Sequence, residues 1–187
     1  MIIANLHEHS VLVDKLEPSG SGYIGRHSPN LLDANNAQWI GFSVEIGPDG
    51  NVYVLDWHDA DICGKDVLHK ETGRVFRIAP KESRAKDWNG RYGDLTALGD
   101  AELVELQKSP SSWHARRARV ILHGRAAAGK LAPETHGSLL KLVTDTSNPE
   151  DLRLQALWAL HVTGGATVHR LLALLEDKES HLRAWAI

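Results

Sequence analysis

The sequence has one cysteine and no long apolar run, and each shortage excludes a class of protein. A single cysteine, Cys63, excludes an internal disulfide framework, a cysteine-rich zinc site and the CxxCH attachment site of a c-type haem within these residues. No stretch approaches the roughly 18 apolar residues of a membrane-spanning helix, and residues 1–5 include no basic leader. We therefore expect no membrane span and no signal peptide in this segment.

An excess of positive charge is also lacking. The formal net charge is −3, with 10 Lys and Arg against 14 Asp and Glu in residues 1–99, and 11 against 10 in residues 100–187. Neither part has the basic surface that nucleic-acid binding requires, so we expect no nucleic-acid partner. Hydrophobic residues make up 42% of the chain and charged residues 24%, which is close to average soluble usage and predicts a folded protein.

Residues 1–80 lack helical periodicity and consist of short runs rich in Val, Ile, Tyr and Phe between Gly, Pro, Asn and Asp. This pattern predicts strands at about 1–6, 11–16, 42–47, 51–57 and 74–79. Pro48-Asp49-Gly50 lies between two of these runs and predicts a hairpin turn. We also predict that residues 74–78 pair with residues 51–57 in the same sheet.

Residues 81–99 are polar and suit a linker, and helical patterns follow. We predict helices at about 100–108, 111–127, 134–145, 149–163, 166–177 and from 180 onward, with Asp100 and Ser112 as N-caps. An apolar stripe should form one continuous core between antiparallel helices. Its members are Leu152, Ala156, Leu160, Leu171, Leu172 and Leu175.

The helical part contains an internal repeat. Residues 152–157 match residues 182–187, residues 115–120 are a weaker copy, and the aligned alanines lie 38 and 30 residues apart. Periods of this size with two helices per unit predict an α-solenoid. The last copy reaches Ile187 without a polar capping repeat, so we expect the sequence to be a piece of a longer protein.

Six short motifs carry a resemblance to a known family. They are Gly20-Ser21-Gly22-Tyr23, Arg26-His27, Gly47-Pro48-Asp49-Gly50, the residues of 52–57, Cys63 and the residues of 73–78. Together they resemble a bacterial family of large exported proteins described as membrane-bound dehydrogenases. Those proteins join a propeller similar to quinoprotein glucose/sorbosone dehydrogenases to HEAT-like repeats, usually followed by a c-type cytochrome domain. The resemblance covers residues 5–80 in detail and the helical part only in type.

The resemblance implies a fold and a function. Residues 1–80 would be a partial β-propeller containing the last blade region, residues 81–99 a linker, and residues 100–187 a truncated HEAT-like α-solenoid. The whole protein would be periplasmic or secreted and would oxidise a sugar or alcohol with pyrroloquinoline quinone and Ca²⁺, with haem c only outside this segment. Its partners for this chain would be the remaining propeller blades, further HEAT repeats and a cytochrome domain.

Two alternatives stand beside that function. The first is a non-catalytic protein-interaction scaffold built from propeller and HEAT repeats, because both folds commonly act in this way. The second is a cytoplasmic HEAT protein with an unrelated β cap. A quinone site needs donors from several blades, and little more than one blade is expected here, so we predict that the isolated chain is catalytically inert.

The best candidate for chemistry is the long connection from residue 58 to residue 73. His58 and Asp59 are the candidate catalytic residues, and Asp59 and Asp61 are the candidate metal ligands. In a blade, the segment before residue 42 would emerge on the same face. It would bring Arg26, His27, Asn30, Asp33, Asn35 and Asn36 near this loop.

Structural roles compete with these functional ones. Asp56 and Trp57 suit a strand end, with the carboxylate accepting backbone N–H bonds and the indole packing against the next blade. Arg153 and Arg183 occupy equivalent repeat positions and are expected to bond helix ends or carboxylates. Other candidates have a structural alternative too: Cys63 as a small buried residue, His7 and His9 as a surface pair on one strand face, and Trp113, Trp158 and Trp185 as packing residues.

Overall fold

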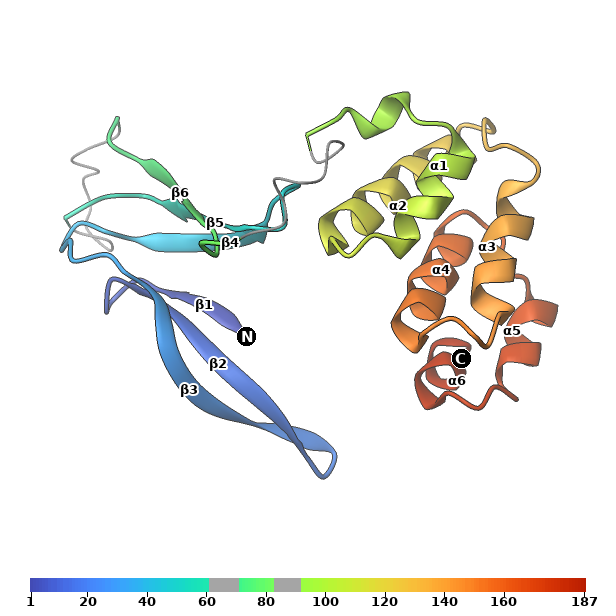
Figure 1. Cartoon of the computed structure of the whole chain (residues 1–187), viewed down its shortest axis with the longest axis horizontal. Helices are drawn as coiled ribbons and strands as arrows, with labels where there is room; N and C mark the ends of the chain where they lie inside the picture. The colour runs from blue at the N-terminus through green and yellow to red at the C-terminus, as the bar shows by residue number, and fades with distance from the viewer. Residues whose placement is uncertain (61–70, 83–91) are drawn as a thin grey trace. The chain divides into compact units, whose positions relative to one another are not determined.

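The computed structural model describes residues 1–60, 71–82 and 92–187. The chain divides into two compact units, Met1–Arg91 and Tyr92–Ile187, which we call the β unit and the helical unit. Figure 1 shows strands in the first and helices in the second. Among the described residues, no helix has the length and apolar character needed to cross a membrane.

The β unit contains two antiparallel three-stranded sheets (Figure 1). The first sheet has the order β1 (Ile2–Asn5), β2 (Ser10–Ser19) and β3 (Gly22–Asp33). The second has the order β4 (Gly41–Ile46), β5 (Val52–Asp56) and β6 (Arg74–Ile78). In both sheets neighbouring strands are consecutive in the sequence, so each sheet is a simple meander.

The predicted hairpin is confirmed. β4 and β5 pair antiparallel with Ile46 opposite Val52, and the turn closes with a 3.0 Å bond from the Gly50 N–H to the Gly47 carbonyl. Gly50 has a φ of +73°, a left-handed conformation that glycine adopts without a steric cost. The predicted pairing of β6 with β5 is also confirmed, with Val52 opposite Ile78.

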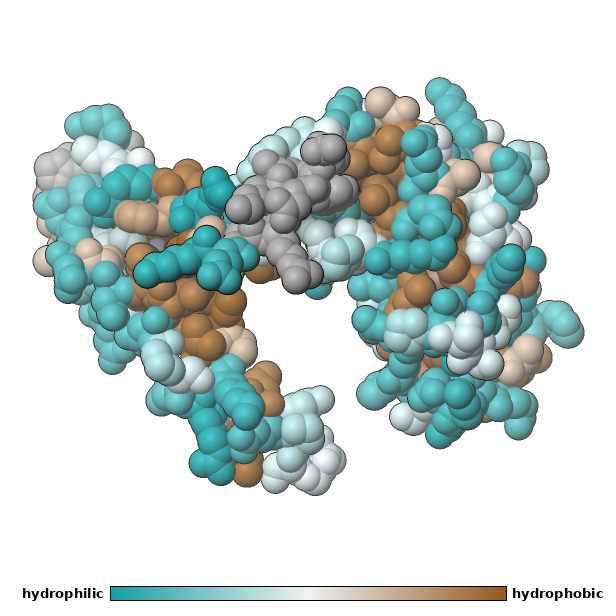
Figure 2. All heavy atoms as spheres, viewed as in Figure 1, coloured by the Kyte–Doolittle hydropathy of each residue, from teal (hydrophilic) through white to brown (hydrophobic). Residues whose placement is uncertain are grey.

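The core of the β unit is small and lies between its two sheets. Val11 of the first sheet, Val54 of the second, and Trp39 from the segment before β4 are fully buried. A Cβ atom at Gly41 would lie 2.1 Å from the Trp39 ring, so only glycine fits beneath this indole. Figure 2 shows hydrophobic residues gathered in the middle of this unit.

The prediction of a partial β-propeller is wrong. Both sheets are three-stranded and open, whereas propellers are built from four-stranded blades around a central channel. Residues 22–33 were not predicted as a strand, and they form β3, the longest described strand. Gly, Ser, Pro and Asn residues in this segment weaken the sequence pattern typical of a strand. The segment is extended because it pairs with β2, from Ser10 opposite Asp33 to Ser19 opposite Gly22.

Six helices form the described helical unit, together with the short 3₁₀ helices η2 (Leu95–Ala97) and η3 (Leu106–Lys108). They are α1 (Asp100–Glu105), α2 (Ser112–Ala127), α3 (Thr135–Thr144), α4 (Glu150–Val162), α5 (Val168–Leu174) and α6 (Ser180–Trp185). All six predicted helices are confirmed. The predicted N-caps are off by one residue, because Gly99 and Ser111 occupy these positions.

The prediction of a HEAT-like α-solenoid is also wrong. A solenoid stacks similar units that contact only their neighbours, but these helices range from 6 to 16 residues and share one buried cluster. Fully buried members of that cluster include Leu103, Leu122, Leu139, Leu160 and Leu182. The local sequence match therefore reflects similar helix faces in one small helical core rather than a stacked repeat.

The predicted apolar stripe is correct in part. Ala156 and Leu160 are fully buried, and Leu171 and Leu175 pack against the core from partly buried positions. Leu172 points outward and is 58% exposed. Leu174 is buried in its place, so the core-facing stripe of α5 runs through Leu171, Leu174 and Leu175.

Candidate functional site

The predicted catalytic residue His58 lies two residues after the end of β5 and is held by local bonds. Its backbone N–H donates to Asp56 Oδ1 at 3.0 Å, and its Nδ1 lies 2.8 Å from Thr72 Oγ1. Nε2 lies 3.4 Å from the amide nitrogen of Asn36, one of the residues expected to approach this loop. His58 also has a left-handed φ of 56°, so both its backbone and its ring are fixed by this strand end.

The proposed metal ligands are not brought together among the described residues. Asp59 is 3% exposed, while Asp61 and Cys63 lie outside the described residues. Within the described ranges, no group of three or more His, Cys, Asp and Glu residues could hold a metal ion. A metal bound by Asp59 and Asp61 therefore stays a prediction from the sequence.

Arg26 and His27, two of the residues expected on the same face, instead lie in β3. Arg26 pairs with Glu17 at 3.0 Å and His27 with Asp14 at 2.6 Å, both across the β2–β3 hairpin. His9 was expected on a strand face and instead lies in the turn before β2, with Nδ1 2.9 Å from the Trp39 carbonyl. These side chains support the β unit locally.

Asp56 organises the end of β5. Its buried carboxylate accepts the backbone N–H groups of Ile40 at 2.8 Å and His58 at 3.0 Å, and it pairs with Arg74 at 2.6 Å. The expectation that Asp56 accepts backbone N–H bonds is confirmed. Trp57 is 52% exposed and makes an edge contact with Phe42, so its expected role as a packed plug is wrong.

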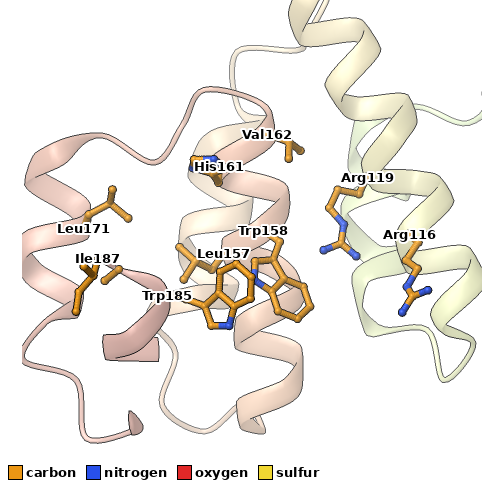
Figure 3. A pocket seen from close by; sticks show the side chains of 10 residues that line it. Arg116, Arg119, Leu157, Trp158, His161, Val162, Leu171, Trp185 and Ile187 are labelled. Atoms are coloured by element: carbon orange, nitrogen blue, oxygen red, sulfur yellow. The ribbon is translucent and has the colours of Figure 1, made fainter. Parts of the chain in front are cut away.

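The helical unit contains a pocket of about 620 Å³ (Figure 3). Its walls come from α2, α4, α5 and the C-terminal end of α6. The lining residues are Arg116, Arg119, Leu157, Trp158, His161, Val162, Leu171, Trp185, Ala186 and Ile187. They include no carboxylate, hydroxyl or thiol side chain, so the pocket is apolar and aromatic with a basic side.

Two tryptophans form the centre of this pocket. The rings of Trp158 on α4 and Trp185 on α6 meet edge to face with centroids 5.1 Å apart, and Figure 3 shows them side by side. Trp158 lies beside the core positions Leu157 and Leu160 of α4, so the same helix supplies both core and pocket wall. The expected packing role of Trp185 therefore holds in part, because its ring packs against Trp158 while the residue is 57% exposed.

Two arginines of α2 form the basic side. Arg116 and Arg119 are three residues apart and share one helix face. The Arg119 guanidinium lies 5.2 Å from the Trp158 ring centroid and donates to Gln155 Oε1 at 2.9 Å. Burial, and then the charge of Arg116, lower the pKa of Arg119 from its ordinary value, so the site places its positive charge in an unfavourable environment.

Other arginines of the helical unit have structural partners. Arg153 is almost completely buried, bonds the Val143 carbonyl at 2.7 Å and pairs with Asp177. Arg183 donates to the carbonyls of Asp177 at 2.7 Å and Lys178 at 2.9 Å. The expectation that these two arginines bond helix ends or carboxylates is confirmed, and it separates them from Arg116 and Arg119.

Sequence reasoning did not predict this pocket. It assigned Trp158 and Trp185 to packing and Leu171 to the apolar stripe. Arg116 and Arg119 at a spacing of three residues were a usable signal, because they share a helix face that offers no acidic residue. No signal joined them to Trp185, which is 66 residues further along the chain.

Comparisons with other proteins do not identify either unit. No family model, no curated protein and no solved structure matches the chain. The resemblance to the quinoprotein dehydrogenase family therefore stays a prediction that rests on the motifs in residues 5–80.

Proposed function

We propose that this chain is a non-catalytic binding module whose helical unit takes up an amphipathic helix of a partner protein. The observation that carries the proposal is the 620 Å³ pocket with Trp158, Trp185 and Arg119 on its walls. Trp and Arg are enriched among the residues that dominate binding energy at protein interfaces. Grooves between helices commonly receive the apolar face of another helix.

The chemistry of the pocket favours binding over catalysis. No nucleophile or carboxylate side chain lines the pocket beside His161. In the β unit, the ring nitrogens of His58 lie near Thr72 and Asn36, and the Asp56 carboxylate is taken up by backbone N–H groups and Arg74. We therefore expect neither unit alone to supply an acid–base pair.

The binding test uses the whole 187-residue chain and a labelled neutral peptide. The peptide is about 14 residues long, with Leu or Phe at positions i, i+3, i+4 and i+7 and Gln or Ala elsewhere. We expect saturable binding by fluorescence anisotropy, with Kd roughly between 1 and 100 µM, and a negative heat-capacity change by calorimetry. Absence of binding would contradict the proposal.

A matched pair of variants locates that binding. Trp185→Ala removes a tryptophan that is 57% exposed in the pocket, and Trp57→Ala removes one that is 52% exposed in the β unit. We expect Trp185→Ala to weaken peptide binding about tenfold or more and Trp57→Ala to leave it unchanged. Equal effects of the two substitutions would show that the peptide does not use the pocket.

The family resemblance supports a second, separate proposal about a longer protein that contains this chain. That protein would be a periplasmic or secreted dehydrogenase of sugars or alcohols using pyrroloquinoline quinone and Ca²⁺, with haem c bound elsewhere. This chain would be inert by itself. Incubation with the quinone, Ca²⁺, a panel of sugars and alcohols, and an artificial dye should give no turnover. Turnover that disappears in the double variant His58→Ala, Asp59→Ala would contradict inertness and assign catalysis to this loop.

A further inference from the structure

The arginines that the structure describes in the helical unit differ in their partners. Arg125 pairs with Asp100 at 2.5 Å and Arg153 pairs with Asp177, whereas Arg170 and Arg183 donate to uncharged backbone carbonyls. Three arginines of α2, namely Arg116, Arg117 and Arg119, form no ion pair with a described residue, and of these Arg116 and Arg119 line the pocket. The positive charge on the basic side of the pocket is therefore not balanced by a described carboxylate.

The surroundings of Arg119 make a negative partner favourable. A guanidinium carries five N–H donors in a planar fork, and the neutral bond to Gln155 uses one of them. The Trp158 ring supplies a cation–π contact but no acceptor oxygen. Burial first, and then the charge of Arg116, lower the pKa of Arg119, and a carboxylate bound to this fork would offset both effects by forming charge-assisted bonds.

The pocket has a basic side and an apolar side, and this arrangement favours an amphipathic ligand. Figure 3 shows Arg116 and Arg119 on α2 to one side of the tryptophan pair, with Leu171 and Ile187 on the opposite side. A ligand that fills the pocket must therefore place apolar groups against the indoles and can place a negative group toward α2. On a helix these two requirements are met by residues three or four positions apart.

We propose that the pocket selects amphipathic helices of a partner protein that carry Glu or Asp one turn from their apolar anchors, and that Arg116 and Arg119 read this carboxylate. The inference rests on the proposed binding function and names the partner's chemistry. The charge complementarity between the basic side and the carboxylate decides which helices bind, while the apolar contacts hold them.

Three peptides with the same apolar residues test this selectivity. They differ only at the position one turn from the anchors, which carries Gln, Glu or Lys. At low ionic strength we expect the Glu peptide to bind about tenfold more tightly than the Gln peptide, and the Lys peptide to bind most weakly. Added salt should reduce the preference for Glu and leave the Gln peptide nearly unaffected.

Adjacent arginines on α2 provide the matched control. Arg116→Gln and Arg119→Gln should each reduce the Glu-over-Gln preference severalfold, whereas Arg117→Gln, outside the pocket lining, should preserve it. Arg116 is exposed, so its substitution keeps the test meaningful even if Arg119→Gln disturbs packing on Trp158. Circular dichroism at 222 nm checks the fold of each variant.

The outcomes separate this inference from the proposed function. If the Gln peptide binds and the Glu peptide binds no better, only the selectivity for acidic helices is overturned. If none of the three peptides binds, the binding function fails with it. Arginine-dependent binding of phosphatidylglycerol vesicles without binding of the Glu peptide would overturn the assignment to a protein partner.

Discussion

The two units differ in what occupies their interiors. In the β unit the buried apolar cluster consists of Val11, Trp39 and Val54, and the buried polar residues include Asp49 and Asp56. The helical unit buries 15 hydrophobic residues in one cluster. Short strands with few inward apolar residues depend on bonded carboxylates, whereas amphipathic helices depend on apolar area. The β unit thus uses its carboxylates for structure, and the helical unit leaves Arg116 and Arg119 without a described carboxylate partner.

The two units also differ in which residues adopt left-handed backbone conformations. Three described non-glycine residues have left-handed φ values, namely His9 at 51°, Asn35 at 47° and His58 at 56°, and all belong to the β unit. In the helical unit, positive φ among the described residues occurs at Gly129 and Gly164, which follow α2 and α4. Strained turns in the β unit persist because side-chain bonds such as His9 to the Trp39 carbonyl fix them.

The largest expected effect comes from removing the buried Arg153–Asp177 ion pair, a polar contact within the apolar helical unit. Asp177→Ala would leave the Arg153 guanidinium buried without its charge partner, since the Arg153 side chain is 1% exposed. We expect a loss of about 3–5 kcal/mol in the free energy of unfolding, measured by urea denaturation followed at 222 nm. Glu105→Gln, in an exposed pair with Lys108, is the control and should change it by about 0.5 kcal/mol or less.

The pH dependence of the free energy of unfolding tests the same Arg153–Asp177 pair. Hydrogen bonding from Arg153 lowers the pKa of Asp177, although burial opposes this shift. A carboxyl whose pKa is lower in the folded state stabilises the fold fully above its unfolded pKa of about 4. That stabilisation is lost as pH falls through the folded pKa. Between pH 7 and acid, Asp177→Asn should therefore lose less stability than the unmodified chain.

The apolar side of the comparison is tested by two leucines. Leu160→Ala should destabilise the helical unit by about 2–5 kcal/mol, because Leu160 is fully buried and the deletion leaves a cavity. Leu172→Ala, at a position that is 58% exposed, should change the free energy of unfolding by about 0.5 kcal/mol or less. Equal losses in urea denaturation would show that the core face of α5 is wrongly assigned.

The polar side is tested at Asp56. Asp56→Asn replaces an acceptor for two backbone N–H groups and for Arg74 by a neutral amide, and we expect the β unit to lose about 1–3 kcal/mol. Hydrogen exchange should accelerate in peptides covering β4 and β5 but not in those covering α2 to α4. Glu45→Gln on the exposed part of β4 is the control. Unchanged exchange in Asp56→Asn would remove Asp56 from its organising role.

The smallest expected effects come from replacing one glycine by alanine in each unit, which should change the stability of the two units in opposite directions. Gly50→Ala places a Cβ on a residue with φ +73° and should cost the β unit about 1–2 kcal/mol. Gly124→Ala in α2 should stabilise the helical unit by about 0.5–1 kcal/mol, since alanine favours helices. A Cβ at either position meets no atom within 4 Å, so hydrogen exchange would report backbone preference alone.

Local patterns predicted what local interactions decide. The six helices and the hairpin at Gly50 follow from apolar periodicity and turn chemistry, and the structure has them. The strand β3 was missed because its residues have little strand propensity and depend on a partner strand. Leu172 was assigned inward because helical spacing allows a stripe through Leu171, Leu172 and Leu175, whereas packing in the structure selects Leu174 in its place.

The candidate site likewise combines features that follow from neighbouring residues with features that depend on distant segments. His58 and Asp59 were chosen because polar residues cluster near them in the sequence, yet the structure commits His58 to Thr72 and its own backbone to Asp56. The pocket residues were all visible in the sequence, but their proximity was not. A carboxylate's availability depends on its bonds, and a pocket depends on segments far apart in the chain.

The sequence by itself determined the helices of the second unit, the β4–β5 hairpin and the structural use of Asp56 and Arg153, because each depends on neighbours or on the high cost of an unpaired buried charge. Only the tertiary structure decided that the sheets stay open and that the helices share one core. It also decided that Trp158 meets Trp185 while Arg116 and Arg119 stay without a carboxylate, because packing between distant segments settles which side chains are used up and which remain exposed.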